Sequence, residues 1–326
     1  MKAGRITVST KDFAITDIPI PEPHVGEVRI RVRAAGVCLS DVHFLDGTLK
    51  PGYLEGDVVT LGHEVAGTID KIGGGVHTYK EGDRVVVVAG ERNEKGQILT
   101  LGFDYDGGYA EYVIAKAGLL VRIPDSLPFE EAAIIPDAVS TPWAAISSTA
   151  KMQSGERAAV FGVGGLGIHA VQLLAMIGCE VIAIDPRADA REKALKVGAI
   201  AAFDPSDESI KKYRGLNAAF DFAGVTAVRK QALSLLGEGG RLVIVGIANE
   251  PITIPNDMAF TYMRTQIMGH YGSEPKHTKE LVQFIADGKL DLSASVTEVL
   301  PLADAALALE KLEKKIGNPI RIVLKP

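Results

Sequence analysis

The segment Ala158-Ala-Val-Phe-Gly-Val-Gly-Gly-Leu-Gly167 decides the predicted fold of this chain. Its four apolar residues indicate a buried strand, and the glycines that follow are typical of a tight turn that opens a helix. Gly162 permits the turn, Gly164 lets the backbone approach a pyrophosphate, and Gly167 allows the helix to pack closely on the strand. The helix N-terminus adds N–H donors and a partial positive charge. The segment therefore predicts a dinucleotide site, the alternative being a turn without a ligand.

An acidic residue lies where the next strand is expected to end. Asp185 follows Gly167 by 18 residues, and its carboxylate can accept hydrogen bonds from both hydroxyls of a ribose. A carboxylate there would repel a 2′-phosphate, which predicts NAD rather than NADP as the cofactor. Arg187 could meet such a phosphate and works against this preference.

Apolar runs and helical periodicity alternate from about residue 155 onward. The expected strands are Ala158–Gly162, Val181–Asp185, Ala218–Phe222 and Arg241–Gly246. The expected helices run through Leu174, over Ala190–Val197 and near Val228–Leu236. This alternation predicts an α/β fold with a doubly wound parallel sheet. Strands that are apolar almost throughout fit a sheet covered on both faces.

The first hundred or so residues are typical of an irregular β domain. Glu27–Arg33 alternates apolar and charged residues, and short apolar stretches follow at Val65–Ile69, Arg84–Val88 and Ala110–Ala115. The tail predicts two helices and a last strand, at 278–287, 303–314 and 320–324, and we expect it to return to this first domain. The expected domains are therefore residues 1–138 with 272–326, and a dinucleotide-binding domain of residues 139–271.

Composition narrows the functional class. With 326 residues, two domains are expected rather than one. A net charge of −6 and a pI near 5.7 argue against nucleic acid as the main partner. No apolar run reaches the roughly 18 residues of a membrane helix, and the N-terminus has no apolar signal region. The two cysteines, Cys38 and Cys179, form no disulfide framework, so a cytoplasmic location is expected.

Two further segments carry candidate metal ligands. Cys38 lies in Gly36-Val-Cys-Leu-Ser-Asp-Val-His43, and His63 lies in Gly62-His-Glu-Val-Ala-Gly67. Alone, such a pair would suggest a buried thiol and a surface imidazole. Together with Gly82-Asp-Arg-Val85 and Gly107-Gly-Tyr-Ala-Glu-Tyr112, however, the chain resembles the zinc-dependent medium-chain alcohol dehydrogenases from about residue 20 to its C-terminus. The resemblance implies a GroES-like catalytic domain followed by a Rossmann cofactor domain.

The resemblance also implies one catalytic zinc per chain. Cys38, His63 and Asp137 match its three protein ligands, which leaves a fourth position for water or a substrate oxygen. Glu64 matches an acidic residue that approaches the metal during ligand exchange. Many relatives hold a second, structural zinc by four cysteines, but Val86–Asp106 contains no cysteine. We therefore expect a short polar loop and no structural zinc in this stretch.

The remaining catalytic assignments follow from the same motif. Ser40 and His43 match a relay that moves the alcohol proton to solvent, although His43 alone also fits a solvated surface residue. Asp41 is expected to orient His63 or the surroundings of Cys38, its alternative role being to cap a turn.

Further cofactor contacts are implied by matching positions in the family. Thr141 and Leu166 match positions that pack near the nicotinamide, and the backbone at Val245 and Ile247 matches the carboxamide site. Arg321 matches a basic position that meets the pyrophosphate, and its contribution is expected to matter because Leu39 replaces a basic residue found in relatives. The complete predicted cofactor-binding set is Gly162, Gly164, Gly165, Leu166, Gly167, Asp185, Arg187, Thr141, Val245, Ile247 and Arg321.

The expected function is NAD-linked interconversion of an alcohol with an aldehyde or ketone, by a homodimer or homotetramer as in the family. Two alternatives remain open. One is a zinc-free enoyl or quinone reductase of the same superfamily, and the other is a catalytically silent dinucleotide-binding protein.

Overall fold

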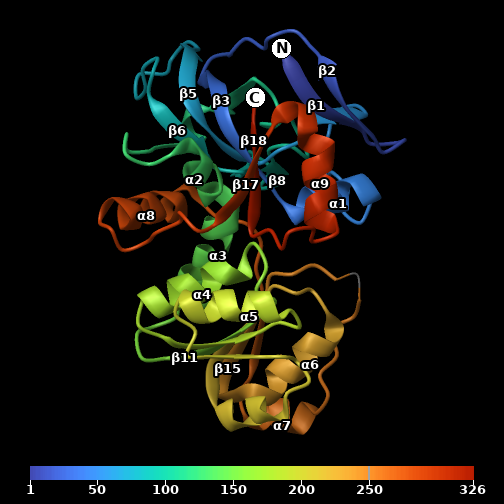
Figure 1. The fold of residues 1–326 in the computed structure, drawn as a ribbon, viewed down its shortest axis with the longest axis vertical. Coiled ribbons are helices and arrows are strands. Elements are labelled where there is room, and N and C mark those ends of the chain that lie inside the picture. Colours follow the sequence, from blue (N-terminus) through green and yellow to red (C-terminus); the bar gives the residue numbers. More distant parts are fainter. Residues whose placement is uncertain (249) are drawn as a thin grey trace. The chain divides into compact units, whose positions relative to one another are not determined.

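The computed structural model describes residues 1–248 and 250–326, which divide into two compact units (Figure 1). Unit 1 consists of Met1–Ser140 and Gly272–Pro326, and unit 2 consists of Thr141–Tyr271. The C-terminal segment therefore belongs to the same unit as the first 140 residues. Within the described residues, no helix combines the length and apolar character needed to cross a membrane.

Unit 2 is built on a six-stranded parallel sheet in the order β13-β12-β11-β14-β15-β16. Its strands are β11 (Arg157–Phe161), β12 (Glu180–Ile184), β13 (Ala201–Phe203), β14 (Leu216–Asp221), β15 (Leu236–Ile244) and β16 (Gln266–Gly269). Its α-helices are α3 (Ser140–Ala144), α4 (Gly167–Met176), α5 (Ala188–Lys196), α6 (Thr226–Leu235) and α7 (Asp257–Tyr262), with a π-helix at Ala145–Ala150 and a 3₁₀ helix at Glu208–Tyr213. This is the doubly wound α/β fold predicted from the glycine segment.

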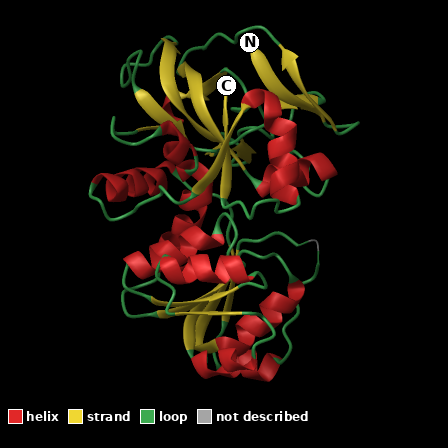
Figure 2. Cartoon of the chain, in the orientation of Figure 1, coloured by secondary structure: helices red, strands yellow, loops and turns green. Residues whose placement is uncertain are grey.

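Burial explains why these apolar runs become central strands. All of Ala158–Phe161 is inaccessible to solvent, as are Leu242 and Val243 of β15, so both faces of the sheet are covered. Helices α4 and α5 contact each other and pack on β11–β13, while α6 packs on β14 and β15, and Figure 2 shows helices flanking the strands of this unit. The strand order reverses beside β11, which is where open α/β sheets bind their ligands.

Unit 1 contains a seven-stranded mixed sheet, a three-stranded sheet and a two-stranded hairpin. Its strands are β1 (Lys2–Thr7), β2 (Asp12–Asp17), β3 (Glu27–Val37), β4 (Val58–Thr60), β5 (Glu64–Ile72), β6 (Arg84–Val87), β7 (Gly90–Arg92), β8 (Ile98–Thr100), β9 (Tyr112–Lys116), β10 (Leu120–Arg122), β17 (Val296–Pro301) and β18 (Arg321–Lys325). Its helices are α1 (Leu39–Asp46), α2 (Phe129–Ala133), a π-helix at Ile135–Val139, α8 (Pro275–Ala286) and α9 (Ala305–Glu313), with 3₁₀ turns at Ala117–Leu119 and Leu302–Asp304.

Strand β3 organises this unit. One edge of β3 pairs with β5 along most of its length, while the other edge pairs first with β9 and then with β18. Val28, Ile30 and Val32 are buried, as the alternating pattern predicted. Register shifts occur up to Ala34, after which Ala34–Val37 is buried continuously. The far end of β3 therefore lies inside the unit rather than on its surface.

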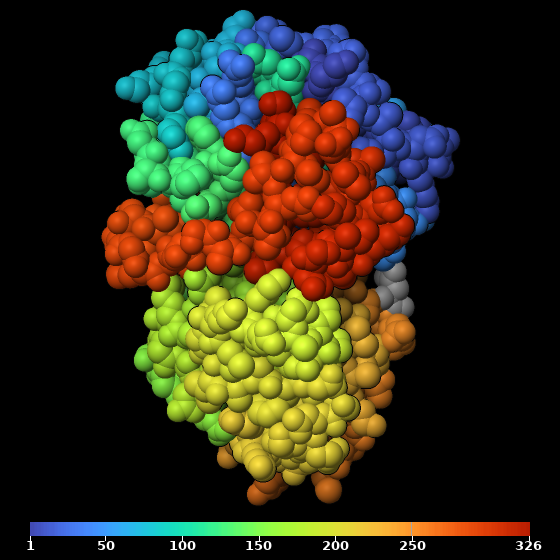
Figure 3. Space-filling view, in the orientation of Figure 1, coloured from blue at the N-terminus to red at the C-terminus, as the bar shows by residue number. Residues whose placement is uncertain are grey.

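The C-terminal segment completes unit 1. Helix α9 packs on α1 and β18, and Figure 3 shows the red C-terminal residues covering one side of this unit. The expected helix at 278–287 begins earlier, at Pro275, because Glu274 and His277 form a capping box at its start. The expected polar loop between β6 and β9 differs from the structure, in which β7 and β8 pair as a hairpin.

A buried ion pair connects three elements of unit 2. Asp221, at the end of β14, accepts hydrogen bonds from the backbone N–H groups of Ala223 and Gly224 and from Arg229 Nε at 2.9 Å. Arg229 lies on α6 and also donates to the carbonyl of Gly246, just beyond β15. Both charged side chains are buried, so each depends on the other for compensation.

Replacing Arg229 by Met should lower the free energy of unfolding of unit 2 by about 3 kcal/mol, because the buried Asp221 carboxylate loses its charged partner. Trp143 is the single tryptophan of the chain and belongs to unit 2, so its fluorescence in a urea titration measures this change. Arg264→Met is the matched control, since Arg264 pairs with Glu238 in solvent and its loss should barely move the midpoint. An unchanged midpoint for Arg229→Met would contradict the assigned role.

Candidate functional site

Sheet register brings the candidate metal ligands together at the far end of β3. Gly36 pairs with Glu64 at the start of β5, and Val37 pairs with Ile322 near the start of β18. Cys38 follows directly after β3, and His63 directly precedes β5. Three segments that are far apart in sequence therefore meet at one buried point.

Gly36 has a steric reason to be glycine. A Cβ atom at this position would lie 1.9 Å from Oε2 of Glu64, which no ordinary side-chain contact allows. The glycine of the Gly-Val-Cys segment therefore makes room for the Glu64 carboxylate beside the ligand set.

Asp137 reaches the same point from the π-helix Ile135–Val139. The backbone N–H of Ala138 donates to Oε1 of Glu64 at 3.0 Å and so fixes this helix against β5. A single π-helical turn changes the direction of side chains relative to an α-helix and is frequent at functional sites. Here it brings a partly exposed carboxylate to a buried thiol and imidazole.

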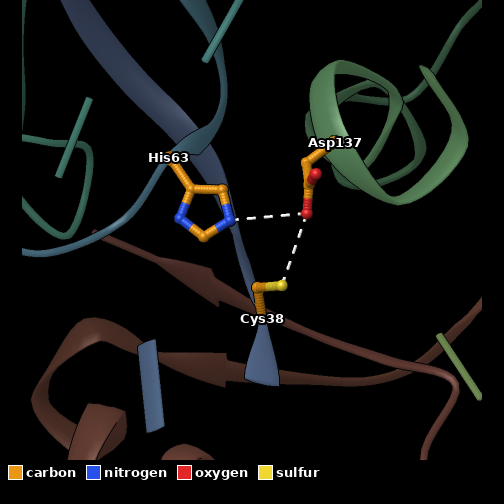
Figure 4. A group of neighbouring side chains, drawn as sticks. All are labelled: Cys38, His63 and Asp137. Atoms are coloured by element: carbon orange, nitrogen blue, oxygen red, sulfur yellow. Dashed lines mark hydrogen bonds and ion pairs between the residues drawn. The ribbon is translucent and has the colours of Figure 1, made fainter. Parts of the chain in front are cut away.

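The geometry of the three side chains fits a tetrahedral metal. Oδ2 of Asp137 lies 3.3 Å from Sγ of Cys38 and 3.4 Å from Nε2 of His63 (Figure 4). The three donor atoms all lie within 4.8 Å of one another. Neighbouring donors around tetrahedral Zn²⁺ are about 3.3–3.6 Å apart. Two of the three donor separations thus match tetrahedral coordination, and three protein ligands would leave the fourth position of the metal for water or a substrate oxygen.

His63 is supported from behind by Asp41 and Tyr109. Asp41 Oδ1 lies 3.4 Å from Nδ1 of His63, an ion-pair separation rather than a hydrogen bond. The other oxygen, Oδ2, accepts hydrogen bonds from the Tyr109 hydroxyl at 2.8 Å and the Cys38 backbone N–H at 2.9 Å. Both Asp41 and Tyr109 are fully buried. A carboxylate placed behind a histidine fixes the ring orientation and raises its basicity as a ligand.

Glu64 and Arg321 form a buried ion pair beside the ligand set. Arg321 is only 2% exposed, and its Nη2 lies 2.9 Å from Glu64 Oε1, 3.5 Å from Asp137 Oδ2 and 3.6 Å from Cys38 Sγ. Burial raises the pKa of Glu64 to about 7 against the opposing effect of Arg321. Among the described residues, Glu64 Oε2 has no hydrogen-bond partner. Glu64 thus keeps one oxygen without a partner in the described chain, on the side that faces Gly36.

Arg321 is predicted from the family to meet the cofactor pyrophosphate. In the structure its guanidinium contacts groups of unit 1, namely Glu64, Asp137, Cys38 and the Val37 carbonyl. The sequence does not indicate that Arg321 lies against Glu64 and Asp137 in the interior of unit 1. A contact with the pyrophosphate stays a prediction.

Ser40 and His43 lie three residues apart on α1 and so share one side of it. Ser40 Oγ donates to Cys38 Sγ at 3.0 Å and lies 3.4 Å from His63 Nε2, so the hydroxyl borders the donor atoms directly. Phe103 packs its ring 5.2 Å from that of His63 and walls one side of the imidazole.

In unit 2, the glycine segment has the form that the sequence predicts. Gly162 adopts a φ of +83°, and a Cβ on Gly167 would lie 1.9 Å from the Gly162 carbonyl oxygen. A Cβ on Gly164, in contrast, would meet nothing within 4 Å. The turn is therefore tight where the chain packs and open where a pyrophosphate would approach. These residues fit a dinucleotide.

Apart from Arg321, the other predicted cofactor residues also belong to unit 2. Gly165 and Leu166 complete the glycine segment and are partly exposed, and Thr141 is buried with its carbonyl accepting from His270 Nε2 at 3.1 Å. Val245 and Ile247 follow β15, where their loop crosses Gly224 closely enough that a Cβ on Gly224 would lie 2.5 Å from the Ile247 carbonyl. Asp185 is buried and bonded to Arg187. These assignments stay predictions.

Tyr109 contributes to the site although sequence reasoning assigns it no role. Its segment, Gly107–Tyr112, is recognisable as a family motif, but its partner Asp41 lies 68 positions earlier. The signal available in the sequence is the tyrosine of this motif itself, since a buried tyrosine hydroxyl ordinarily needs a hydrogen-bond partner.

Comparison with known proteins identifies the family. Residues 24–125 match the alcohol dehydrogenase GroES-like domain, and residues 165–287 match the zinc-binding dehydrogenase domain. An alcohol dehydrogenase of Geobacillus stearothermophilus is 32% identical, with 100% of this chain and 99% of the relative covered. An (R,R)-butanediol dehydrogenase of Bacillus subtilis is also 32% identical, over 97% of this chain and 99% of the relative.

A solved structure supports the same family assignment. The alcohol dehydrogenase of Aeropyrum pernix superposes with a TM-score of 0.88 at 29% identity, with 100% of both chains covered. The chain therefore belongs to the zinc-dependent medium-chain alcohol dehydrogenases, as its motifs indicated.

Tyr109→Phe should weaken zinc binding by about 10- to 100-fold, because it removes the hydroxyl that holds the Asp41 carboxylate behind His63. The measurement is competition for zinc against a chromophoric chelator. Tyr105→Phe is the matched control, since the Tyr105 hydroxyl is buried but has no hydrogen-bond partner among the described residues. Equal zinc affinities for Tyr109→Phe and Tyr105→Phe would contradict the role of Tyr109 in supporting His63 through Asp41.

Zinc affinity should rise with pH. Burial disfavours the imidazolium, but Asp41 and Asp137 outweigh it and raise the pKa of His63 well above 6.5 in the metal-free protein. Zinc binds the neutral ring and must displace this proton, so His63 alone should contribute a fall in affinity of about tenfold per unit as pH drops below the raised pKa. Chelator competition between about pH 6 and 8 measures the slope, and His277→Gln should not change it. A flat profile would be inconsistent with a protonated His63.

Proposed function

We propose that this chain transfers a hydride between a nicotinamide cofactor and an alcohol and its aldehyde or ketone. The observation that carries the proposal is the donor set of Cys38, His63 and Asp137, spaced as around a tetrahedral metal with one corner open. A catalytic zinc site differs from a structural one by that open corner, where a substrate oxygen can bind. The family assignment supports the same chemistry.

Zinc held by Cys38, His63 and Asp137 would supply Lewis acidity at the substrate oxygen, and a nicotinamide held by unit 2 would supply the hydride chemistry. The protein contributes orientation and a path for the proton. We assign the first position of that path to Ser40, whose hydroxyl borders Cys38 and His63. His43, on the same side of α1, is assigned the transfer to solvent, a role suited to an imidazole.

Asp41 and Glu64 act on the ligands rather than on the substrate. Asp41 holds the orientation of His63 through the ion-pair contact at Nδ1. Glu64 balances Arg321 with one oxygen and keeps its second oxygen without a partner among the described residues. The position of Glu64, next to His63 in sequence and joined to Asp137 through Arg321, suits its predicted role in approaching the metal when water and substrate exchange.

We propose NAD as the preferred dinucleotide. The open side of Gly164 suits the pyrophosphate, and the Asp185 carboxylate at the end of β12 suits the two ribose hydroxyls. Backbone groups of Val245 and Ile247, with Thr141 and Leu166 nearby in unit 2, are proposed to hold the nicotinamide end.

We also propose a cytoplasmic homodimer or homotetramer. Both cysteines are free thiols, which suits a reducing compartment. Unit 2 exposes a series of apolar side chains that a subunit contact would cover. They are Ile247, Ile252, Ile254, Met258 and Tyr262.

The two alternatives make different demands on the site. The reaction of a zinc-free enoyl or quinone reductase does not require a thiolate, an imidazole and a carboxylate directed at one point. A catalytically silent dinucleotide-binding protein does not require the Ser40 hydroxyl beside those donors. The donor geometry therefore favours the alcohol dehydrogenase over both.

Metal analysis with an alcohol and carbonyl panel tests the proposal. We expect about one zinc per chain, and Cys38→Ala should lose the zinc and at least about a thousandfold of kcat/KM. Cys179→Ala is the control, because Cys179 is a buried thiol of unit 2 outside the donor set and should keep both. Full zinc and activity in Cys38→Ala would overturn the assignment, and reduction of an enone C=C bond by zinc-free protein would favour the reductase.

A further inference from the structure

A hollow on unit 1 gathers cationic side chains from three strands and lies away from the metal ligands. Its volume is about 460 Å³, which falls in the range of roughly 300–1,000 Å³ that is typical of small-molecule sites. The cations that line it are Arg33 of β3, Arg84 of β6 and Lys325 of β18. Arg33 precedes Cys38 by five residues and Lys325 follows Arg321 by four. The hollow therefore lies roughly 15 Å from the ligand set along the same strands.

Arg33 is placed at this hollow by an irregularity of β3. Val32 pairs with Gly67 of β5, and Ala34 pairs with the adjacent Ala66. Arg33 lies between them without a partner on β5 and is the extra residue of a β-bulge, a feature that re-aims side chains and is frequent beside functional sites. Its side chain is exposed and makes no hydrogen bond or ion pair with the described residues. The Arg33 charge is therefore available to a ligand.

Arg84 uses little of its hydrogen-bonding capacity within the protein. Its guanidinium carries five N–H donors, of which one at Nη2 bonds the Leu127 carbonyl, while Nε makes no hydrogen bond to the described residues. The planar group stacks on Phe129, with Cζ 4.1 Å from the ring centroid, and Nε lies 4.0 Å from the wholly exposed Asp125 carboxylate. Stacking fixes the plane of the guanidinium and leaves donors on its edge for an anion.

One carboxylate, Glu130, also lines the hollow and is paired with Lys325. Lys325 Nζ donates to Glu130 Oε1 at 2.5 Å, and this bond lowers the pKa of Glu130, so the carboxylate is ionised at neutral pH. Thr68 of β5 adds a hydroxyl, and a Cβ on Gly82 would meet nothing within 4 Å, so that side is open. The lining residues thus carry three positive charges and one negative charge, in a chain whose net charge is −6.

From this geometry we propose that the hollow binds the phosphate group of a small organic molecule. A phosphate monoester carries about −1.5 to −2 charges at neutral pH, which matches the surplus of positive charge in the lining. Guanidinium and ammonium groups bind phosphate oxygens, and a hydroxyl adds a further donor. The hollow is larger than a phosphate group, and Phe129 supplies an apolar wall for the organic part. This site is separate from the proposed hydride transfer.

Titration calorimetry on the zinc-loaded protein tests the site with inorganic phosphate, glycerol 3-phosphate and phenyl phosphate. Saturating ADP-ribose is present throughout, so that the proposed dinucleotide site is occupied. About one equivalent of each probe should bind, and the affinity should fall as salt rises, because the contacts are between charges. Tighter binding of the two esters than of inorganic phosphate supports an organic phosphate as the ligand. Equal binding of all three would overturn that part and leave free phosphate as the ligand.

Charge variants locate the binding. Arg33→Met removes a charge that has no partner among the described residues and should weaken phenyl phosphate binding at least about fivefold. Lys325→Met should weaken it similarly, with Lys116→Met as the matched control, since each lysine is exposed and pairs with one glutamate. Glu130→Gln removes the carboxylate of the lining and should strengthen binding about threefold.

The gain expected for Glu130→Gln keeps the test decisive, because a misfolded variant would lose binding rather than gain it. Affinities that stay unchanged in Arg33→Met, Lys325→Met and Glu130→Gln would overturn the site. A lack of saturable binding of every probe up to about 10 mM would also overturn it. Neither result bears on the metal ligands, so the proposed hydride transfer would stand, and a failure of that activity would leave the phosphate site untouched.

Discussion

The burial of Arg321 among three acidic groups is the constraint on which unit 1 depends. Glu64, Asp137 and Cys38 all approach a guanidinium that is almost completely removed from water. Charges in such a setting must be matched, because an unpaired one costs several kcal/mol. The register of β18 against β3 and of β5 against β3 is therefore coupled to the ligand set. A slip of one residue in either pairing would turn a charged side chain away from its partner.

The fold is largely predictable from local pattern. The strand–glycine–helix segment at Ala158–Gly167 and the alternation after it determine the doubly wound sheet, and the period of Glu27–Arg33 determines the core face of β3. The short strands β1, β4 and β13 escape sequence-based prediction, since their pairing is decided by distant partners. The π-helix at Ile135–Val139 also has no recognisable local pattern, so only the family resemblance points to Asp137.

Less of the candidate site than of the fold can be predicted from the sequence. Residue types indicate which charged groups are present, but not which of these groups pair with one another in the folded chain. In the sequence Asp185 and Arg187 act as opponents, one favouring NAD and the other NADP, whereas in the structure they are bonded to each other. Similarly, the motif connects Arg321 only with a cofactor phosphate, while its partner Glu64 lies 257 positions earlier in the chain. Contacts of this separation are set by sheet topology, which no short motif contains.

The pairing of β3 with β18 has a consequence for synthesis of the protein. Residue 321 is made 283 positions after Cys38, and the whole of unit 2 is made in between. While the ribosome is producing unit 2, the end of β3 has an open edge, and Glu64 lacks the guanidinium that balances it. The buried end of β3, with the ligand set beside it, is therefore fully packed and charge-balanced only after β18 has been made.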